Sequence, residues 1–117
     1  MLADGGPKGP IQEVARTAGI LAAKRTAEWI PMCHPLGLDH VEIEFSDLGD
    51  DRLEILARTS CSGKTGVEME ALTAASATAL CVYDMTKAVC RGTVIEDIRL
   101  LEKRGGRSGI WRADDAE

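Results

Sequence analysis

The sequence predicts an α+β fold in which two helices pack on one face of an antiparallel sheet. Three observations predict it. Segment 11–29 carries apolar residues at helical spacing, and segment 66–90 is built mostly of Ala, Leu, Met and Thr with few helix breakers. Between them, two short segments alternate apolar and charged residues, as half-buried strands do. The length of 117 residues suits one domain with a modest core, so we expect residues 1–117 to form a single domain.

The first helix is predicted to run from Ile11 to Trp29. Pro10 suits the start of this helix, and Pro31 marks its end. Gly19, near the middle, costs about 1 kcal/mol relative to alanine unless another backbone lies close to it. The apolar positions that indicate the helix are Ile11, Val14, Ala15, Ala18, Leu21 and Ala22.

Two strands are predicted next. Val41, Ile43 and Phe45 alternate with glutamates, and residues 53–57 show a similar alternation. The intervening SDLGDD, residues 46–51, has the composition of a turn. We therefore expect an antiparallel hairpin.

The long helix follows a glycine-punctuated loop, SCSGKTG. It is expected to begin at Thr65 or Gly66 and to end at Arg91-Gly92, because glycine favours the position just past the last helical turn. Residues 94–101 are predicted to form a final strand, and the remaining tail a loop.

The predicted order is helix, strand, strand, helix, strand. A strand before Lys8 would complete the β-α-β-β-α-β order of the ferredoxin-like fold. The opening MLADGGPKGP is rich in glycine and proline and is itself expected to be a loop. The sequence therefore predicts a ferredoxin-like domain that lacks its N-terminal segment and first strand.

Composition excludes several classes of protein. A net charge of -5 argues against binding nucleic acid through the overall field of the protein, and a hydrophobic content of 44% argues against disorder. The longest apolar run is far shorter than the ~20 residues of a membrane span. No CxxC pair and no secretory signal accompany the 4 cysteines, which predicts reduced thiols in a cytoplasmic protein rather than disulfides. Aromatic residues make up only 3%, so an alanine-rich core that relies on partner subunits is expected.

The long helix carries charged residues at both ends. Glu68 and Glu70 stand near its start, while Asp84 and Lys87, three residues apart, share a face near its end. A carboxylate beside an amine can transfer protons. Glu70 and Asp84 are about 21 Å apart at 1.5 Å per residue, so one small ligand cannot contact both within a single chain. Two such helices packed antiparallel across a two-fold axis would unite them, which predicts a site at a subunit interface.

The Cys33-His34-Pro35 segment is bracketed by prolines 31 and 35, which restrict the backbone and would orient the imidazole of His34. An ordinary surface histidine is the alternative. No second ligand pair with zinc-site spacing accompanies it, so no metal site is predicted.

Three further segments offer cations. Lys64 lies in SGKTG, where Arg58 occupies the position that a P-loop requires to be glycine; a helix N-terminus that holds an anion and a solvated lysine both remain open. Lys103 and Arg107 lie in KRGGRSG, which suits phosphate or a flexible tail equally. Lys8 in GPKGP is by default a solvated loop lysine.

A family resemblance covers nearly the whole chain. The segments that carry it are KG (8–9), ARTAGILAAKRT (15–26), IPMCHPL (30–36), SGKTGVEMEALTAASATAL (62–80), YDMTKAV (83–89) and RLLEKRGGRSG (99–109). Together they resemble the molybdenum cofactor biosynthesis protein C family, the cyclic pyranopterin monophosphate synthases. The resemblance implies a ferredoxin-like domain, a homohexamer built as a trimer of dimers, and active sites at a dimer interface.

The resemblance also implies an activity. Members convert (8S)-3′,8-cyclo-7,8-dihydroguanosine triphosphate to cyclic pyranopterin monophosphate and pyrophosphate. No redox cofactor is implied, and whether a divalent cation accompanies the triphosphate is left open. A small nucleotide-derived substrate is expected, with no nucleic acid and no membrane as partner.

Roles carry over to matching residues. Asp84 stands at the position of the family's catalytic acid/base, and Lys87, Lys8 and His34 are expected to assist it. The residues expected to contact substrate are Met32, Cys33, His34, Glu68, Met69, Glu70, Lys64, Lys103 and Arg107. The chain departs from the family pattern in its missing front segment and in Pro10, where many members have aspartate after the glycine.

Two other classes of function remain as alternatives. One is a non-catalytic module that binds a small molecule at a dimer interface. The other is a subunit that scaffolds other enzymes of the pathway. The binding module does not explain the acid–lysine pair, and turnover by the isolated protein separates both alternatives from an enzyme.

Overall fold

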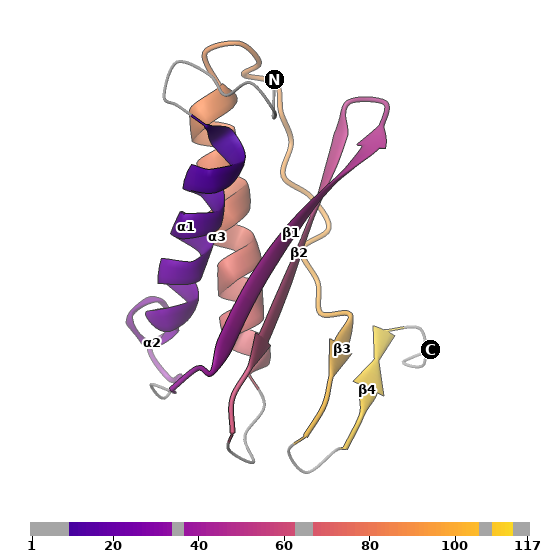
Figure 1. Cartoon of the computed structure of the whole chain (residues 1–117). Coiled ribbons are helices and arrows are strands. Elements are labelled where there is room, and N and C mark those ends of the chain that lie inside the picture. Colours follow the sequence, from indigo (N-terminus) through magenta and orange to yellow (C-terminus); the bar gives the residue numbers. More distant parts are fainter. Residues whose placement is uncertain (1–9, 34–36, 63–66, 106–108, 114–117) are drawn as a thin grey trace.

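The computed structural model describes residues 10–33, 37–62, 67–105 and 109–113. Helices α1 and α3 lie side by side and cover one face of the β1–β2 hairpin, which makes a two-layer α+β arrangement (Figure 1). The predicted fold class is therefore confirmed. The elements in chain order are α1 (Ile11–Lys24), α2 (Thr26–Trp29), β1 (His40–Gly49), β2 (Arg52–Ser60), α3 (Glu68–Thr86), β3 (Glu102–Lys103) and β4 (Trp111–Arg112).

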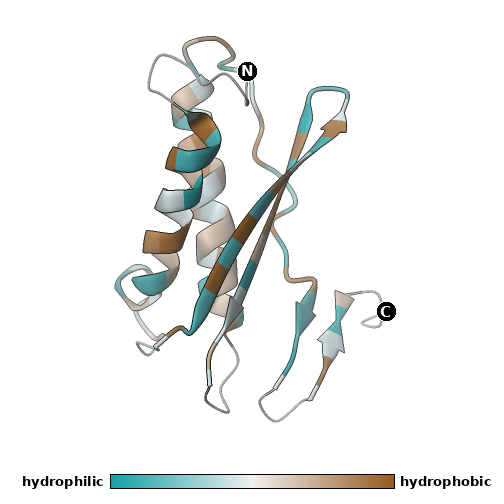
Figure 2. Cartoon of the chain, viewed as in Figure 1, coloured by the Kyte–Doolittle hydropathy of each residue, from teal (hydrophilic) through white to brown (hydrophobic). Residues whose placement is uncertain are grey.

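Strands β1 and β2 pair antiparallel, as predicted, from His40 opposite Ser60 to Asp47 opposite Leu53. Apolar and polar residues alternate along β1 in Figure 2. The apolar side of this alternation faces the helices, and Ile43 is only 3% exposed. The connecting turn uses left-handed backbone at Asp50 and Asp51, a conformation that aspartate tolerates better than most residues.

Small residues let the two helices approach each other closely. A Cβ atom at Gly19 would overlap the hydroxyl oxygen of Thr78 and the end of Ile43, and would lie 3.0 Å from the carbonyl oxygen of Ala74. Another backbone therefore does lie close to Gly19, which is the condition under which glycine is favoured in the middle of this helix. The buried alanines around this contact are Ala15, Ala22 and Ala23 of α1 and Ala74 and Ala77 of α3.

The first helical segment is interrupted at Arg25, so the prediction of one unbroken helix to Trp29 is wrong. The hydroxyl of Thr26, which is 2% exposed, donates to the carbonyl oxygen of Ala23 at 2.9 Å. The backbone N–H of Arg25 bonds to the carbonyl of Ala22, three residues back, at 3.0 Å. A buried threonine that bonds back to the preceding turn commonly bends a helix.

Helix α3 ends at Thr86, five residues before the predicted stop at Arg91. The backbone N–H groups of Val89 and Cys90 both bond to the carbonyl oxygen of Thr86, at 3.0 and 2.9 Å, and close the chain into turns there. The local glycine signal was therefore overridden by an earlier turn.

Residues 94–101 do not form the predicted strand. A strand needs a neighbour for its backbone hydrogen bonds, and within the described ranges β1 and β2 pair only with each other. Asp97 has left-handed backbone with φ 59°, and Val94 is 73% exposed. Pairing occurs instead in the tail predicted to be loop, where β3 and β4 form a short antiparallel ladder.

No helix in the part of the chain that the structure describes is long and apolar enough to cross a membrane.

Candidate active site

The first turn of α3 brings two carboxylates together with side chains from two distant segments. Glu70 is 2% exposed, and its Oε2 lies 4.0 Å from the Sγ of Cys33, which follows α2. Glu68 Oε1 lies 3.3 Å from the Nζ of Lys103, which comes from β3. Carboxylates are favoured at a helix N-terminus because the unpaired N–H groups and the helix dipole are positive there. We call these four residues the carboxylate cluster.

Within the carboxylate cluster, the thiol of Cys33 stays protonated. Burial, followed by the nearby carboxylates of Glu70 and Glu68, raises the pKa of the Cys33 thiol. A thiol with a raised pKa is a weak nucleophile and a hydrogen-bond donor. Cys33 is therefore suited to hold a ligand or a neighbouring carboxylate rather than to form a covalent intermediate.

The other end of α3 holds the predicted acid–lysine pair. Lys87 Nζ lies 2.9 Å from Asp84 Oδ1, which confirms the expected i,i+3 contact. The hydrogen bond from Lys87 to Asp84, and the charge of Asp84, raise the pKa of the lysine. Both side chains are 52% exposed, and the contact with Asp84 outweighs the lowering effect of burial on the pKa of Lys87. Lys87 is consequently an ammonium at neutral pH, able to donate a proton or contact an anion.

The two groups lie at opposite ends of α3 (Figure 1). Fourteen residues separate Glu70 from Asp84, which corresponds to about 21 Å along the helix axis. A single chain therefore does not bring the carboxylate cluster and the acid–lysine pair to one small ligand.

A comparison with known protein families settles which family this is. The model of the MoaC family matches residues 1–106. The chain belongs to the MoaC family. The match includes both ends of α3 and extends through Lys103 of β3. The MoaC family is a family of molybdenum cofactor biosynthesis enzymes.

Several residues with expected roles in the MoaC resemblance lie outside the described residues: Lys8, His34, Lys64 and Arg107. Among the described residues, Met32 and Met69 make no polar contact with the carboxylate cluster. Met32 is 90% exposed, and Met69 is half-buried on the first turn of α3.

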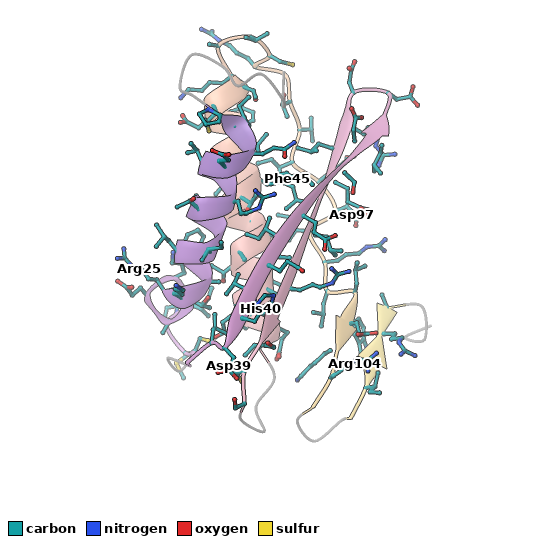
Figure 3. All side chains as sticks on the ribbon, in the orientation of Figure 1. Arg25, Asp39, His40, Phe45, Asp97 and Arg104 are labelled. Atoms are coloured by element: carbon teal, nitrogen blue, oxygen red, sulfur yellow. The ribbon has the colours of Figure 1, made fainter. Side chains whose placement is uncertain are left out.

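Polar residues that the sequence patterns did not indicate lie near the end of the molecule that holds the carboxylate cluster. Asp39, which precedes β1 and is labelled in Figure 3, accepts a hydrogen bond from the hydroxyl of Ser62, just after β2. Their only signal was that each flanks a strand end next to a loop. Glu102 was also missed: hydrogen bonds from Arg104 and Arg112 lower the pKa of its carboxyl to about 2. No sequence signal identified this trio, because it depends on the pairing of β3 with β4.

Among the described residues, no group of three or more His, Cys, Asp or Glu side chains is arranged to hold a metal ion.

Proposed function

We propose that this chain is a cyclic pyranopterin monophosphate synthase. It converts (8S)-3′,8-cyclo-7,8-dihydroguanosine triphosphate to cyclic pyranopterin monophosphate and pyrophosphate, a lyase reaction of molybdenum cofactor biosynthesis. Membership of the MoaC family is the observation that carries this proposal. The carboxylate cluster and the acid–lysine pair support it, because they supply the proton-transferring and cationic groups that such a reaction needs.

The two ends of α3 have different roles in the proposed reaction. The reaction opens the five-membered ring of the purine, rebuilds it as a pterin and closes a cyclic phosphate as pyrophosphate leaves. Asp84 accepts and returns protons, and Lys87, held as an ammonium by its contact with Asp84, donates them. Lys103 stabilises phosphate charge as the leaving group develops. No redox cofactor takes part in these steps.

We assign supporting roles to the residues outside the described ranges on the strength of the resemblance. Lys8 and His34 assist the proton transfers, while Lys64 and Arg107 neutralise the triphosphate. A divalent cation bound to the triphosphate is compatible with this scheme.

The active form is a homo-oligomer with sites between chains. Because Glu70 and Asp84 are about 21 Å apart on one helix, a complete site needs the first turn of α3 from one protomer and the last turn from its partner. We propose a homohexamer built as a trimer of dimers. Exposed apolar side chains on the outer face of the helices support association: Leu21 is 49%, Trp29 47% and Leu80 55% exposed.

We place the reaction in the cytoplasm. All four cysteines are described, and none of them forms a disulfide. Thiols that stay reduced fit a reducing compartment.

The test is pyrophosphate release and pterin formation from the cyclised dihydro-GTP, measured on the chain and on two variants, Asp84→Asn and Glu70→Gln. Each variant alone is expected to lose nearly all turnover. Mixing the two by denaturation and refolding restores part of it, because a heterodimer carries one site with both native residues. With random pairing, about a quarter of the sites are intact, since half of the dimers are mixed and each has one good site of two.

Two results would contradict the proposal in different ways. If the wild-type chain and a version extended at its N-terminus both fail to turn over, the synthase assignment is wrong and a binding module is favoured. If the wild type is active but the mixture stays inactive, the site does not span two chains. A mixture of Asp84→Asn with Lys87→Met serves as the control, because both changes lie at the same end of α3 and no pairing restores a complete site.

A further inference from the structure

The short hairpin of β3 and β4 is held together by its own contacts. Glu102 accepts hydrogen bonds from Arg104 and Arg112, each at 2.9 Å. The backbone N–H of Ala113 bonds to the carbonyl oxygen of Leu101 at 2.8 Å and extends the ladder. Successive side chains of a strand point to opposite faces, so Lys103 projects away from the Glu102 network. Of the two residues of β3, Glu102 therefore points to one face of the hairpin and Lys103 to the other.

Lys103 reaches the first turn of α3 through Glu68. Its Nζ lies 3.3 Å from Glu68 Oε1, and the two side chains are 27% and 32% exposed. Both values are lower than those of any other ion pair between described residues, of which the next most shielded has side chains 50% and 41% exposed. Screening by water is therefore weakest at this pair.

Glu68 is poorly suited to contact a phosphate itself. Its second oxygen, Oε2, is buried and has no hydrogen-bond partner among the described residues. Its first oxygen, Oε1, accepts a hydrogen bond from Lys103. A carboxylate adjacent to a triphosphate would repel it, whereas the same carboxylate bound to a lysine directs the ammonium toward the ligand.

We propose that Glu68 is a positioning residue that holds Lys103 over the N-terminal turn of α3 for the triphosphate of the ligand. The inference rests on the proposed function and assigns Glu68 a role different from direct contact with substrate. In this proposal the β3–β4 hairpin places Lys103 beside the first turn of α3, although the two segments are far apart in sequence.

The experiment is a double-mutant cycle with Glu68→Gln and Lys103→Met. Steady-state pyrophosphate release gives KM and kcat, and calorimetric titration with inorganic triphosphate gives a binding constant for all four proteins. Glu68→Gln keeps the shape of the side chain and removes its charge. The expected result is a rise of about tenfold in KM and in the triphosphate dissociation constant for Glu68→Gln, and no further change when it is added to Lys103→Met.

The control is Glu44→Gln, which breaks the exposed ion pair between Glu44 and Arg58 at 2.6 Å on the hairpin of β1 and β2. It is expected to leave KM and triphosphate binding unchanged. Urea unfolding of each variant separates loss of fold from loss of function. A purely structural role for Glu68 would shift the unfolding midpoint without a KM effect that depends on Lys103.

The outcomes separate this inference from the proposed reaction. An unchanged KM and triphosphate affinity in Glu68→Gln overturns the inference, and so does an undiminished tenfold effect in the Lys103→Met background, which would indicate direct contact between Glu68 and the ligand. If the wild-type chain binds triphosphate with the expected cycle, but neither it nor the version extended at its N-terminus turns over, the positioning role is supported and the proposed reaction is refuted. Failure of the wild type to bind triphosphate overturns the inference.

Discussion

Replacing Gly19 by alanine is expected to destabilise the fold, although alanine is the better helix former. The added methyl group would occupy space held by the hydroxyl oxygen of Thr78 and by the end of Ile43, and would press on the backbone oxygen of Ala74 at 3.0 Å. Ile43 ends in a flexible group that can rotate away. Thr78 cannot move as easily, because it is fully buried and its hydroxyl donates to Ala74 at 2.7 Å.

The size of the effect follows from two opposing terms. Alanine stabilises a helix interior by about 1 kcal/mol relative to glycine. Forcing a methyl group into a packed contact costs about 1–3 kcal/mol, and the upper end applies because backbone atoms on both helices resist displacement. The net expectation is a loss of about 2 kcal/mol in the free energy of unfolding, which for a domain of this size lowers Tm by about 10 °C.

The assay is urea unfolding of Gly19→Ala, Thr78→Ala and the double variant, followed by circular dichroism. Because Thr78→Ala removes the obstructing oxygen, the double variant is expected to be more stable than the sum of the single effects predicts, by about 1 kcal/mol. Gly92→Ala is the matched control: nothing lies within 4 Å of its Cβ position, so a change within about 0.5 kcal/mol is expected. An unchanged or raised stability for Gly19→Ala, or strict additivity with Thr78→Ala, would refute the close helix contact.

Three further predictions concern charge. The pKa of Glu102 is lowered from 4.5 to about 2, so its ionised carboxyl stabilises the fold above pH 4.5, and this contribution is lost as the pH falls toward 2. Arg112→Gln should therefore lower the urea concentration at the unfolding midpoint at pH 7 and leave it unchanged below pH 2. Iodoacetamide should modify Cys33 slowly at pH 7, and faster in Glu70→Gln because the loss of a nearby carboxylate lowers the thiol pKa; equal rates, tracked by mass spectrometry of the peptide, would contradict this. Asp84→Asn should lower the pKa of the neighbouring lysine, seen by NMR titration of its side chain, and an unshifted titration would show that the ion pair does not form in solution.

The sequence by itself determined the elements whose patterns are local. Alternation along β1 and β2 identified a hairpin, because period-two burial is fixed by strand geometry. The alanine-rich run identified α3, and the spacing of Asp84 and Lys87 fixed their contact, because residues three apart on a helix are neighbours wherever the helix lies. The family resemblance rested on long strings of residues, and the family match confirms it.

Tertiary structure decided the features that depend on distant partners. Residues 94–101 have a strand-like composition but lack a neighbouring strand within the described ranges, and composition alone does not supply one. The break at Arg25 depends on where the hydroxyl of Thr26 finds an acceptor. The pairing of Lys103 with Glu68 joins residues 35 positions apart, so only the folded chain shows that the helix start and the final hairpin meet. Local periodicity reports which face of an element is apolar, whereas the identity of what covers that face is set by the path of the whole chain.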